Sequence, residues 1–409
     1  MNGKGSTFLV FGFSIIFLVV QNNFNSLSTR SVENLTDYYA ETIAHNIAVS
    51  GANMAANQIF FDSDWNAGYD DVPFSGGEFD VSVQKNLSEI KVTSVGEYEG
   101  TSRTIEIILR PSSFSKYAYY LNIFPGNMFL YTGDTIWGPF HTQGKLNTKG
   151  SPVFNGKATS KLGLKMQNPK DPKFYGGYES GVDVPFELDP SIMIEAGRNG
   201  GALFEDATGG NPMDVKLEFN DDGTVTYRTR PTGDEDWGSP TTELLSTLAP
   251  NGVIFNEKGN MYVSGTVAGK YTIGTGLSSG NGHGNVFIED DIVYRTNPLE
   301  DEDCEDLLGI VAANNVVVSD NAANKHDINI HASMFNYKGG ISVENIKSSS
   351  PNMGKMNIIG GLIEYQAQIT GYTNGAGYSQ LIKYDPRLML ETPPFFPATR
   401  KYEIVSWYE

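Results

Sequence analysis

An uninterrupted apolar run over residues 8–20 limits the possible folds of this chain more than any other feature. As a helix it covers about 20 Å, whereas the hydrocarbon core of a membrane is about 30 Å thick. A cleaved secretory signal has a run of this length, but it ends in a small-x-small site, and the first alanine of the chain is Ala40. Ser26-Leu27-Ser28 is only a weak substitute. The run alone is compatible with a signal peptide, a membrane anchor or the spine of an assembly of many copies.

The residues that follow predict a helix that continues to about Phe61. No proline occurs from Gln21 to Phe61, and the glycine after Gly12 is Gly51. We expect one helix of about 50 residues and about 75 Å, membrane-sized at its start and amphipathic afterwards. Small and apolar residues recur every four positions, which predicts a smooth stripe for close packing against another helix or a sheet. The expected helix-packing residues are Ala40, Ile43, Ala44, Ile47, Ala48, Gly51, Ala52, Ala55 and Ala56, with Tyr39 and Ile59 extending the isoleucine row.

The tracts GKGSTFLVFGFSIIFLVV and YYAETIAHNIAVSGANMAANQIF resemble the N-terminal region of PilX-like minor pilins and related type IV pilin-like proteins. The resemblance implies that a short basic leader ends at Gly5, where a prepilin peptidase would cut, and that Ser6 begins the mature protein. Gly3 is a second candidate for the end of the leader. Lys4 supplies the positive charge expected on the cytoplasmic side. The small-residue pattern of the family falls on Ala48, Gly51, Ala52, Ala55 and Ala56.

One position departs from the pattern of major pilins. These resemble one another in carrying Glu at the fifth mature position, where it is thought to neutralise the N-terminal amine of a neighbour. Counting from Ser6, the fifth position of this chain is Val10. Because minor components can lack this acid, the resemblance implies a minor, tip or assembly role rather than a bulk filament subunit.

Residues 62–125 are expected to form an antiparallel β head. Polar and apolar residues alternate from Phe79 to Arg110, with turn residues between the runs, which is typical of a meander of three or four strands. Packed against the end of the long helix, these strands would form a pilin-like head; any small β-sheet is the alternative.

Glycines at a period of six predict that a β-solenoid starts within residues 126–160. Gly138, Gly144, Gly150 and Gly156 are separated by two or three strand-forming residues, a spacing that suits short strands around a narrow coil; chance spacing in a glycine-rich chain is the alternative. Residues 161–250 are less regular, and we interpret them as an insertion with hairpins, one of them at Asp221-Asp222-Gly223.

An internal repeat predicts that residues 251–383 form coils of a parallel β-helix. Apolar residues recur at the third and seventh positions of five aligned segments, and each coil would bury them only against the next. The segments are 261–269, 286–294, 310–318, 328–336 and 357–365. Residues 384–409 are expected to cap the open end. The YDPRL and PPFFP tail and the IWGPFHTQGKL segment also resemble uncharacterised bacterial envelope proteins that join a PilX-like start to a β-helix.

Composition and motifs argue against several functions. A net charge of -19 disfavours nucleic-acid binding, and Cys304, the single cysteine, can form no internal disulfide. No cofactor is expected, although the acidic segment 299–308 could bind calcium weakly; a solvated acidic loop is the stronger reading. His326 and His331 would lie on opposite faces of a strand, so no metal site is expected. A polysaccharide lyase or hydrolase would need clustered carboxylates, and the candidates, Asp290, Asp291, Asp320 and Asp327, fall at bends where Asp is common anyway.

The fold expected is mainly β with one long N-terminal α-helix: a pilin-like helix and antiparallel sheet, followed by a parallel β-helix. The function expected is that of a non-catalytic, membrane-anchored, extracytoplasmic pilin-like protein in pilus or pseudopilus assembly, or in adhesion. Its partners would be the inner membrane, other pilin-like subunits and the assembly machinery, with a surface polysaccharide as a further candidate. The alternatives are a β-helical carbohydrate-binding or carbohydrate-active envelope protein, and a structural protein that self-assembles into filaments.

Overall fold

The computed structural model describes residues 3–86, 89–186, 191–205, 211–276, 283–372 and 374–409. The chain divides into two compact units, Met1–Pro111 together with Lys401–Glu409, and Ser112–Arg400. The first unit therefore ends before residue 125, the boundary expected for the antiparallel head. Residues 401–409 also belong to it, so the whole of 384–409 does not act as one cap on the coils. The reason is the last strand, β29 (Ala398–Tyr408), which joins the sheet of the first unit.

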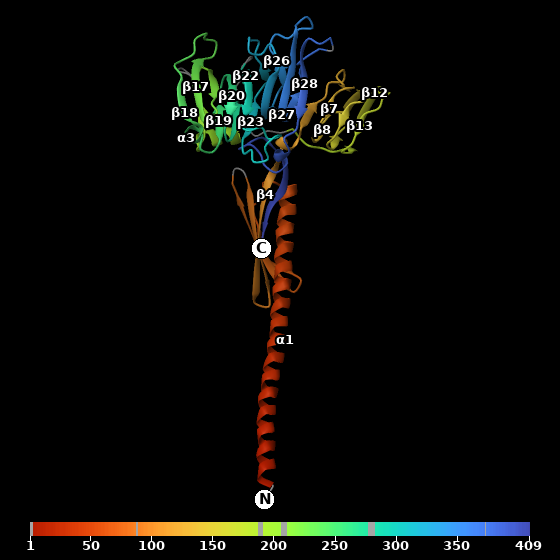
Figure 1. Cartoon of the computed structure of the whole chain (residues 1–409), viewed down its shortest axis with the longest axis vertical. Helices are drawn as coiled ribbons and strands as arrows, with labels where there is room; N and C mark the ends of the chain where they lie inside the picture. Colours follow the sequence, from red (N-terminus) through yellow and green to blue (C-terminus); the bar gives the residue numbers. More distant parts are fainter. Residues whose placement is uncertain (1–2, 87–88, 187–190, 206–210, 277–282, 373) are drawn as a thin grey trace. The chain divides into compact units, whose positions relative to one another are not determined.

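One long helix and one antiparallel sheet make the first unit, as the sequence predicts (Figure 1). The helix α1 spans Gly3–Phe61. The sheet has the order β1-β2-β3-β4-β29, and β1, β2, β3 and β4 pair as antiparallel neighbours. The strands β1 to β4 span Tyr69–Phe74, Gly77–Lys85, Ile90–Tyr98 and Thr101–Ser113.

Alternation of side chains explains the core of this unit. Every second residue of β3, from Ile90 to Gly96, is buried, and the residues between are partly exposed. The buried face of the sheet packs on the C-terminal part of α1, with Phe79, Val92 and Ile105 among its fully buried side chains. The side chains at every second position of the sheet thus pack against the row of small residues on the helix.

The first part of the second unit contains parallel strands that recur every 18 to 21 residues along the chain. β5 (Tyr119–Ile123), β8 (Phe140–Thr142), β11 (Ala158–Ser160) and β14 (Tyr178–Ser180) pair in that order. Two smaller parallel sheets accompany them, each with three strands. They consist of β6 (Leu130–Tyr131), β9 (Leu146–Gly150) and β12 (Leu164–Lys170), and of β7 (Thr135–Ile136), β10 (Val153–Phe154) and β13 (Lys173–Phe174).

Two of the four glycines spaced by six, Gly138 and Gly156, stack with Gly176 in this region, whereas Gly144 and Gly150 do not belong to this stack. A Cβ at Gly156 would lie 2.3 Å from the carbonyl carbon of Gly138, and a Cβ at Gly176 would lie 2.2 Å from that of Gly156. Gly138, Gly156 and Gly176 therefore stack on one another in successive strand layers, where backbones approach too closely for any side chain. The spacing of six corresponds to a third of the 18-residue interval between Gly138 and Gly156.

Further parallel strands make up the rest of the second unit. β15, β19, β21, β23, β25 and β27 follow one another in one set of pairings, and β16, β20, β22, β24 and β26 in another; β28 pairs with β27. Among the named strands of the described residues, β17 and β18 add antiparallel pairs, and an isolated antiparallel bridge joins Gly371 to Gly377. The bounds are β15 Ala202–Phe204, β16 Met213–Phe219, β17 Thr224–Pro231, β18 Thr241–Leu244, β19 Val253–Asn256, β20 Met261–Val267, β21 Lys270–Thr275, β22 Val286–Tyr294, β23 Leu307–Ala312, β24 Val316–Val318, β25 Ile328–Asn336, β26 Ile341–Val343, β27 Asn352–Gln366 and β28 Gly377–Lys383. We call the parallel strands of this unit the strand stack.

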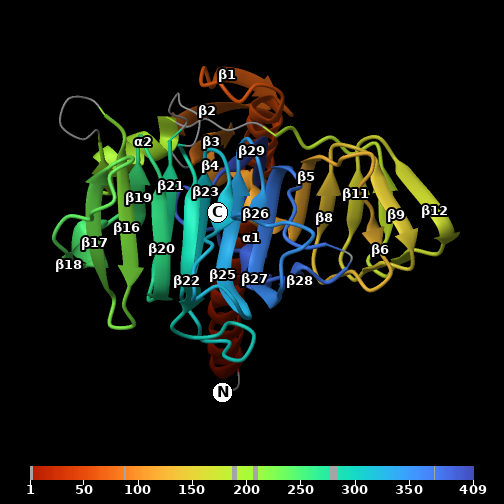
Figure 2. The same ribbon diagram turned by 90° about the horizontal axis from the view of Figure 1, so that it is seen from above.

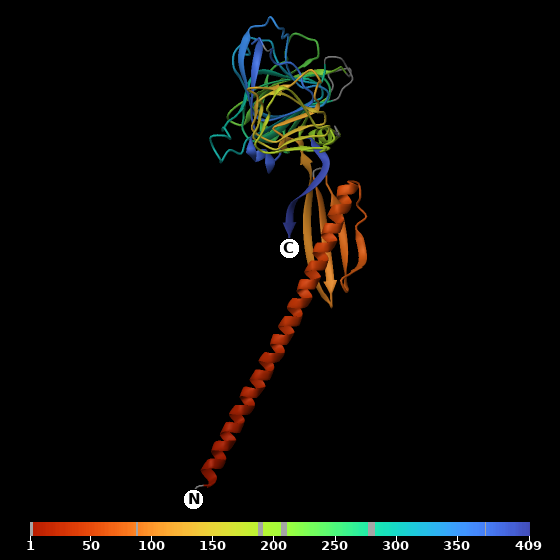
Figure 3. The same cartoon turned by 90° about the vertical axis from the view of Figure 1, so that its right-hand side faces the viewer.

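Sequence order and spatial order differ in the strand stack. β5 pairs with β27, although Tyr119 and Leu362 are more than 240 residues apart. From β5 the chain proceeds to β14 at one end of the stack, and Figure 2 shows β15 to β18 at the other end. Between them, Val184 and Phe186 pack on the outside of the stack against Phe335, and α2 (Ser191–Arg198) packs there through Met193. In Figure 3, which looks along the stack, successive layers overlap.

Segment 161–180 contributes three parallel strands to the stack, β12, β13 and β14, and segment 213–219 forms β16, so the interpretation of 161–250 as an irregular insertion is wrong for these parts. A hairpin does form around residues 221–223, between β16 and β17.

The alignment of the internal repeat needs correction. Met261 pairs with Val286 and Val263 with Ile288, as aligned, but the partner of Val286 in the next layer is Val316 rather than Ile310. Segment 310–318 contains two strands, β23 and β24, that belong to different pairings. Ile328 pairs with Met356, one residue before the position aligned with it. The cause is a set of register shifts and bends that apolar positions alone do not reveal.

A ladder of asparagines holds one bend of the strand stack. The Oδ1 atom of Asn260 accepts hydrogen bonds from the backbone N (3.1 Å) and Nδ2 (3.2 Å) of Asn285. Asn285 in turn accepts from the backbone N of Asn315 (3.2 Å), and Asn315 from that of Gly340 (3.2 Å). The ladder begins at the buried Asp214, which accepts from the backbone N of Asn260 at 3.0 Å. Each side chain thus accepts a hydrogen bond from a backbone N–H of the next layer. Without this acceptor, burial would leave that N–H group unsatisfied.

Candidate membrane and assembly helix

The first part of α1 presents its apolar side chains to the surroundings. All residues from Phe8 to Val20 are exposed, including Phe8 (79%) and Phe17 (69%). The helix from Phe8 contains an 18-residue window of mean hydropathy 1.6, none of which is buried within the chain. By length and composition this helix can cross a membrane. Exposed apolar side chains at this density need a non-aqueous environment or a partner surface.

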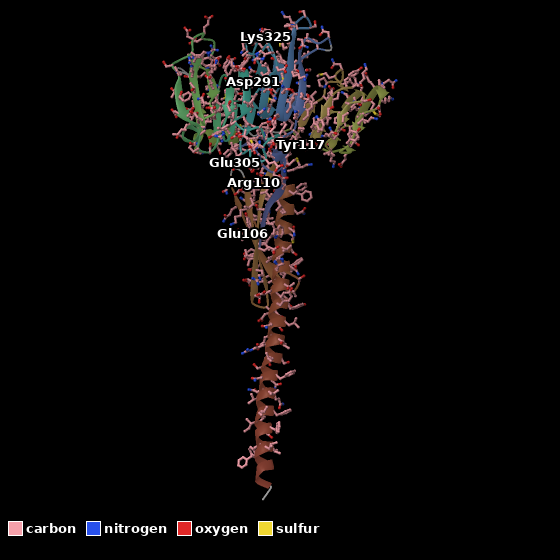
Figure 4. The ribbon with its side chains drawn as sticks, viewed as in Figure 1. Glu106, Arg110, Tyr117, Asp291, Glu305 and Lys325 are labelled. Carbon is pink, nitrogen blue, oxygen red and sulfur yellow. The ribbon has the colours of Figure 1, made fainter. Side chains whose placement is uncertain are left out.

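The second part of α1 is covered by the sheet of its own unit. Ala44, Ala48 and Ala52 are fully buried, and so are Ile47, Ala55 and Ile59. The helix therefore changes character along its length: the first part exposes large apolar groups, and the last part buries small ones. Figure 4 shows side chains projecting around the first part of α1, with no other element of the first unit beside them.

Small residues allow the backbones of helix and sheet to approach closely. A Cβ at Gly96 of β3 would lie 2.4 Å from the backbone O of Ala44 and 2.4 Å from the backbone N of Ala48. On the helix, a Cβ at Gly51 would lie 2.5 Å from Oγ of Ser94. The interface thus requires glycine on both sides, because even one added methyl group would displace a backbone or a buried side chain.

The structure places most of the expected helix-packing residues against the sheet. Ala40, Ala44, Ile47, Ala48, Gly51, Ala52 and Ala55 are buried, while Ile43 and Ala56 are partly exposed and still contact the core of this unit. The sheet residues that receive them, Gly96 above all, did not emerge from the sequence. A glycine within the alternating run TSVGEY indicates a close backbone approach and could have identified this position.

The expected processing residues lie at the start of α1. Gly5 and Ser6 are helical, but the side chains of residues 3–7 lie outside the described part of the chain, as do Met1 and Asn2 altogether. Val10 is exposed at 63%. The structure therefore does not test the cleavage position.

Polar side chains of α1 that follow the apolar run form hydrogen bonds within the helix. The hydroxyls of Ser31, Thr36 and Thr42 donate to the carbonyls four residues earlier, at 2.8 to 3.0 Å. These bonds remove side-chain donors from the helix surface. Glu41 forms an exposed ion pair of 2.7 Å with Arg103 of β4, which ties the helix to its sheet at the level where burial begins.

The carboxylates of the acidic segment 299–308 do not converge on one point in the structure. Asp306 is buried and accepts from the backbone N atoms of Gly269 (2.7 Å) and Thr296 (3.1 Å), whereas Asp301 and Asp303 are exposed, as is Glu305, which is labelled in Figure 4. Within the described ranges, the carboxylates that converge are Asp70, Asp71 and Asp80, on the edge hairpin of the first unit. Asp80 already accepts from the backbone N of Asp71 at 2.8 Å.

The aspartates weighed as catalytic groups serve the bends of the strand stack instead. Asp291, labelled in Figure 4, accepts from the backbone N (2.7 Å) and Nδ2 (2.8 Å) of Asn329. Asp327 accepts from the backbone N of Lys355 at 2.8 Å, and Asp320 pairs with Lys325. Asp290 accepts from the backbone N of Asp291. Each carboxylate thus satisfies neighbouring donors, as Asp side chains commonly do at turns.

The two histidines of this region have different surroundings. Nδ1 of His331 accepts from the backbone N of Tyr294 at 3.1 Å, and burial lowers the pKa of His331 to about 4. His326 is exposed beside the carbonyl of Asp327. His331 therefore acts as a neutral acceptor within the stack.

A buried carboxyl group that the sequence analysis missed lies where β27 meets β5. Glu364 is 1% exposed; its Oε2 accepts from the hydroxyl of Tyr119 at 2.9 Å and its Oε1 from the backbone N of Ile341 at 2.8 Å. Burial raises the pKa of Glu364 to about 8, against the smaller opposing effect of these two hydrogen bonds. The segment GGLIEYQ reads as an apolar strand, and a single Glu within it was the available signal.

The YDPRL motif also has a structural role. Asp385 is buried and forms a 2.7 Å ion pair with Arg387, whose guanidinium also donates to the carbonyl oxygens of Cys304 and Asp306. Arg387 further lies over the ring of Tyr294, 5.8 Å from its centroid. The motif therefore fixes the chain after β28 to the loop before β23.

Comparisons with known proteins add little beyond these observations. No protein-family model matches the chain, and no curated protein matches it either. Among solved structures, the chain is similar to the competence-associated pilin ComZ from Thermus thermophilus, with 11% sequence identity over 90% of this chain and 97% of that one, and a TM-score of 0.36. At this identity and TM-score the likeness assigns no function to this chain.

Proposed function

We propose that this chain is a membrane-anchored type IV pilin-like protein, a minor component of a pilus or pseudopilus whose body lies outside the cytoplasm. The observation that carries the proposal is the division of α1. One continuous helix exposes a membrane-compatible surface over residues 8–20 and buries an alanine and glycine stripe against an antiparallel sheet after Ala40. A signal peptide followed by a globular domain does not need such continuity.

The apolar part alone is short for the hydrocarbon core, but α1 continues without a break through Gln21. A helix that tilts little and carries polar residues at the interface can still anchor a chain of this kind. The acidic charge of the whole chain is compatible with a body that stays away from anionic membrane surfaces. Partners of the exposed helix would be the membrane and the corresponding helices of other pilin-like subunits.

We infer that the strand stack is a parallel β-helix that this anchor displays. Parallel pairing at intervals of 18 to 21 residues, glycines stacked in successive layers and the asparagine ladder support this inference. Its role would be display or adhesion. The alternative of an enzymatic β-helix has less support, because the candidate aspartates are engaged in bends of the stack.

N-terminal sequencing of the protein purified from membranes tests the proposal. Coexpression with a prepilin peptidase is expected to yield a chain that begins at Ser6, and the Gly5→Leu variant is expected to remain uncut. Gly12→Leu is the matched control, because a Cβ at Gly12 has nothing within 4 Å and this position is not at the expected cleavage site. A mature start well beyond residue 21 would contradict the anchor.

A further inference from the structure

The two ends of the strand stack differ in how they are closed. At one end lie β12, β13 and β14, which pair with β9, β10 and β11 and have no second strand neighbour among the described residues. At the other end the β17–β18 hairpin and α3 (Leu245–Leu248) cover the last layer, and Val225 and Leu245 are fully buried there. Figures 1 and 2 both show these strands at opposite ends of the stack.

At the end formed by β12 to β14, the apolar core of the stack is left partly uncovered. Leu146 and Phe154 are fully buried inside the stack, but their register partners in the last layer, Leu164 and Phe174, are partly exposed. Phe174 stacks on Phe154 with ring centroids 4.8 Å apart, and the ring of Tyr178, in the same last layer, lies 5.1 Å from it. Every residue of β12 after Leu164 is exposed. A further layer at this position would cover apolar groups and unpaired strand edges at once.

Positive charge gathers at this end, in a chain that is otherwise strongly acidic. Between Lys145 and Asp183 there are seven lysines and three acidic residues, and all three acids are ion-paired with lysines of the same segment. Four lysines form no ion pair among the described residues; they are Lys145, Lys149, Lys165 and Lys170. Lys149 and Lys165 instead lie over the rings of Tyr131 and Phe129. We call this surface the lysine end.

Negative charge gathers at the opposite end. Between Asp214 and Glu243 there are eight acidic and three basic residues. Asp214 pairs with Arg230 at 3.5 Å, and Lys216 with Glu289 at 3.3 Å, so two of the three basic residues are engaged. Asp221 and Asp222 are exposed in the turn between β16 and β17, and Asp234, Glu235 and Asp236 are exposed between β17 and β18; Leu244 of β18 is exposed as well. We call this surface the acidic end.

We propose that the lysine end of one copy binds the acidic end of a second copy of this chain, so that strand stacks join head to tail. Charge complementarity selects this occupant: seven lysines and three acids give residues 145–183 a net charge of +4, and eight acids and three basic residues give residues 214–243 a net charge of -5. Strand direction is also compatible. β17 is antiparallel to both β16 and β18, so β18 runs in the same direction as β16. When a second copy is placed next to the lysine end along the axis of the stack, its β18 therefore runs in the direction that parallel pairing with the strands of that end requires.

The same charges prevent other pairings of the open edges. Two lysine ends repel one another, and lysines on an edge strand are a common protection against edge-to-edge aggregation. The contact is therefore heterologous, and it forms open chains or rings rather than a two-fold dimer. This inference does not depend on the membrane anchor proposed above, because every residue that carries it belongs to the second unit.

Cysteine crosslinking of the full chain in detergent micelles tests the contact. Gln167→Cys places a thiol on β12 and Thr242→Cys places one on β18, and both positions are exposed. A bismaleimide is expected to link the two variants when they are mixed, and to link neither variant to itself. The mixed product is expected to fall at least tenfold at 0.5 M salt, because salt of this strength screens exposed charges. The native Cys304 is buried, and the parent protein controls for its reaction.

Charge reversal then tests the electrostatic cause. Lys165→Glu with Lys170→Glu is expected to abolish the mixed product, and mixing this protein with Asp234→Lys, Asp236→Lys protein is expected to restore it. Lys347→Glu with Lys355→Glu, at exposed lysines outside both ends, is the matched control. Absence of the mixed product, linking of one variant to itself, or equal loss in the control would overturn the proposal. So would binding of dextran sulfate at the lysine end without any mixed product, which would identify a polyanion as the occupant.

Discussion

The two units of this chain build their interiors from different kinds of contact. The first unit packs a helix on an antiparallel sheet through alanine and glycine, and its fully buried side chains in this interface are apolar apart from Ser94. The second unit stacks parallel strands and buries Asp214, Asn285, Glu364 and Asp385 among them. Close backbone approach therefore specifies the first unit, whereas hydrogen bonds between buried polar groups align the layers of the second.

The largest effect that distinguishes the units is expected at Gly96. Gly96→Leu would force a side chain into the backbone of α1 at Ala44 and Ala48, and should destabilise the first unit by about 3 kcal/mol. Hydrogen exchange should show faster exchange in β3 and the second part of α1, and unchanged exchange in β25 and β27. Gly12→Leu, in the exposed part of α1, should leave both units unchanged. Equal effects in the two units would show that close packing at Gly96 does not specify the first unit by itself.

A smaller effect, confined to the second unit, is expected for the asparagine ladder. Asn285→Ala removes the acceptor of the Asn315 backbone N and the donor to Asn260, and should cost about 2 kcal/mol, because buried donors lose their partners. Urea unfolding followed by hydrogen exchange measures this loss. Gln380→Ala, at an exposed position of β28, should change stability by less than about 0.5 kcal/mol. If Asn285→Ala lowers the free energy of unfolding no more than Gln380→Ala does, the ladder does not stabilise the second unit.

Glu364 should make the stability of the second unit depend on pH. Burial raises the pKa of Glu364 from its usual 4.5 to about 8, so the unfolded chain releases this proton near pH 4.5 and the folded chain near pH 8. Between these values the folded state binds more protons, and rising pH lowers the free energy of unfolding by up to about 1.4 kcal/mol per pH unit. The loss is complete above about pH 8.

Comparison of the wild-type chain with Glu364→Gln isolates this slope, because the amide can still accept from Ile341 and cannot titrate. The pH dependence of urea unfolding should flatten in the variant between pH 4.5 and 8. Glu195→Gln, on the exposed side of α2, should retain the slope of the wild-type chain. Parallel pH profiles for the wild-type chain and Glu364→Gln would contradict a buried, protonated carboxyl group at this position.

The smallest effect is expected for a surface ion pair of the first unit. Lys91 lies 2.8 Å from Glu106, a residue labelled in Figure 4, and both side chains are more than a third exposed. Lys91→Ala should cost about 0.5 kcal/mol or less, because water screens such pairs. Thermal unfolding at low and high salt checks this value, and a loss above about 1 kcal/mol would show that charges contribute more to the first unit than its packing suggests.

The same contrast explains how far the sequence could predict the fold. The helix and the alternating strands of the first unit are local, and the spacing of Ala44, Ala48 and Ala52 directly reflects their burial. The return of β29 to this sheet depends on a pairing across most of the chain, and no local pattern encodes it. The pairing of β5 with β27 was missed for the same reason.

In the second unit, apolar spacing predicted parallel layers but misplaced their register. Asparagine immediately precedes Met261, Val286 and Val316, and these three positions are true register partners. An alignment on Asn260, Asn285 and Asn315 would have placed segment 310–318 correctly, because polar residues at a bend mark the layer more uniquely than apolar residues along a strand. The role of Glu364 required the partner strand to be known, since its acceptor groups serve Tyr119 and Ile341.

The most direct test of the central claim is the accessibility of α1 in membranes. We would place a cysteine at Phe13 or at Thr36 in the full chain, express each variant in bacteria, and treat spheroplasts with a membrane-impermeant maleimide. We expect the chain to stay in the membrane fraction after alkaline carbonate, with Thr36→Cys labelled at once and Phe13→Cys labelled only after detergent is added. A chain released by carbonate, or equal labelling at both positions without detergent, would contradict the membrane anchor.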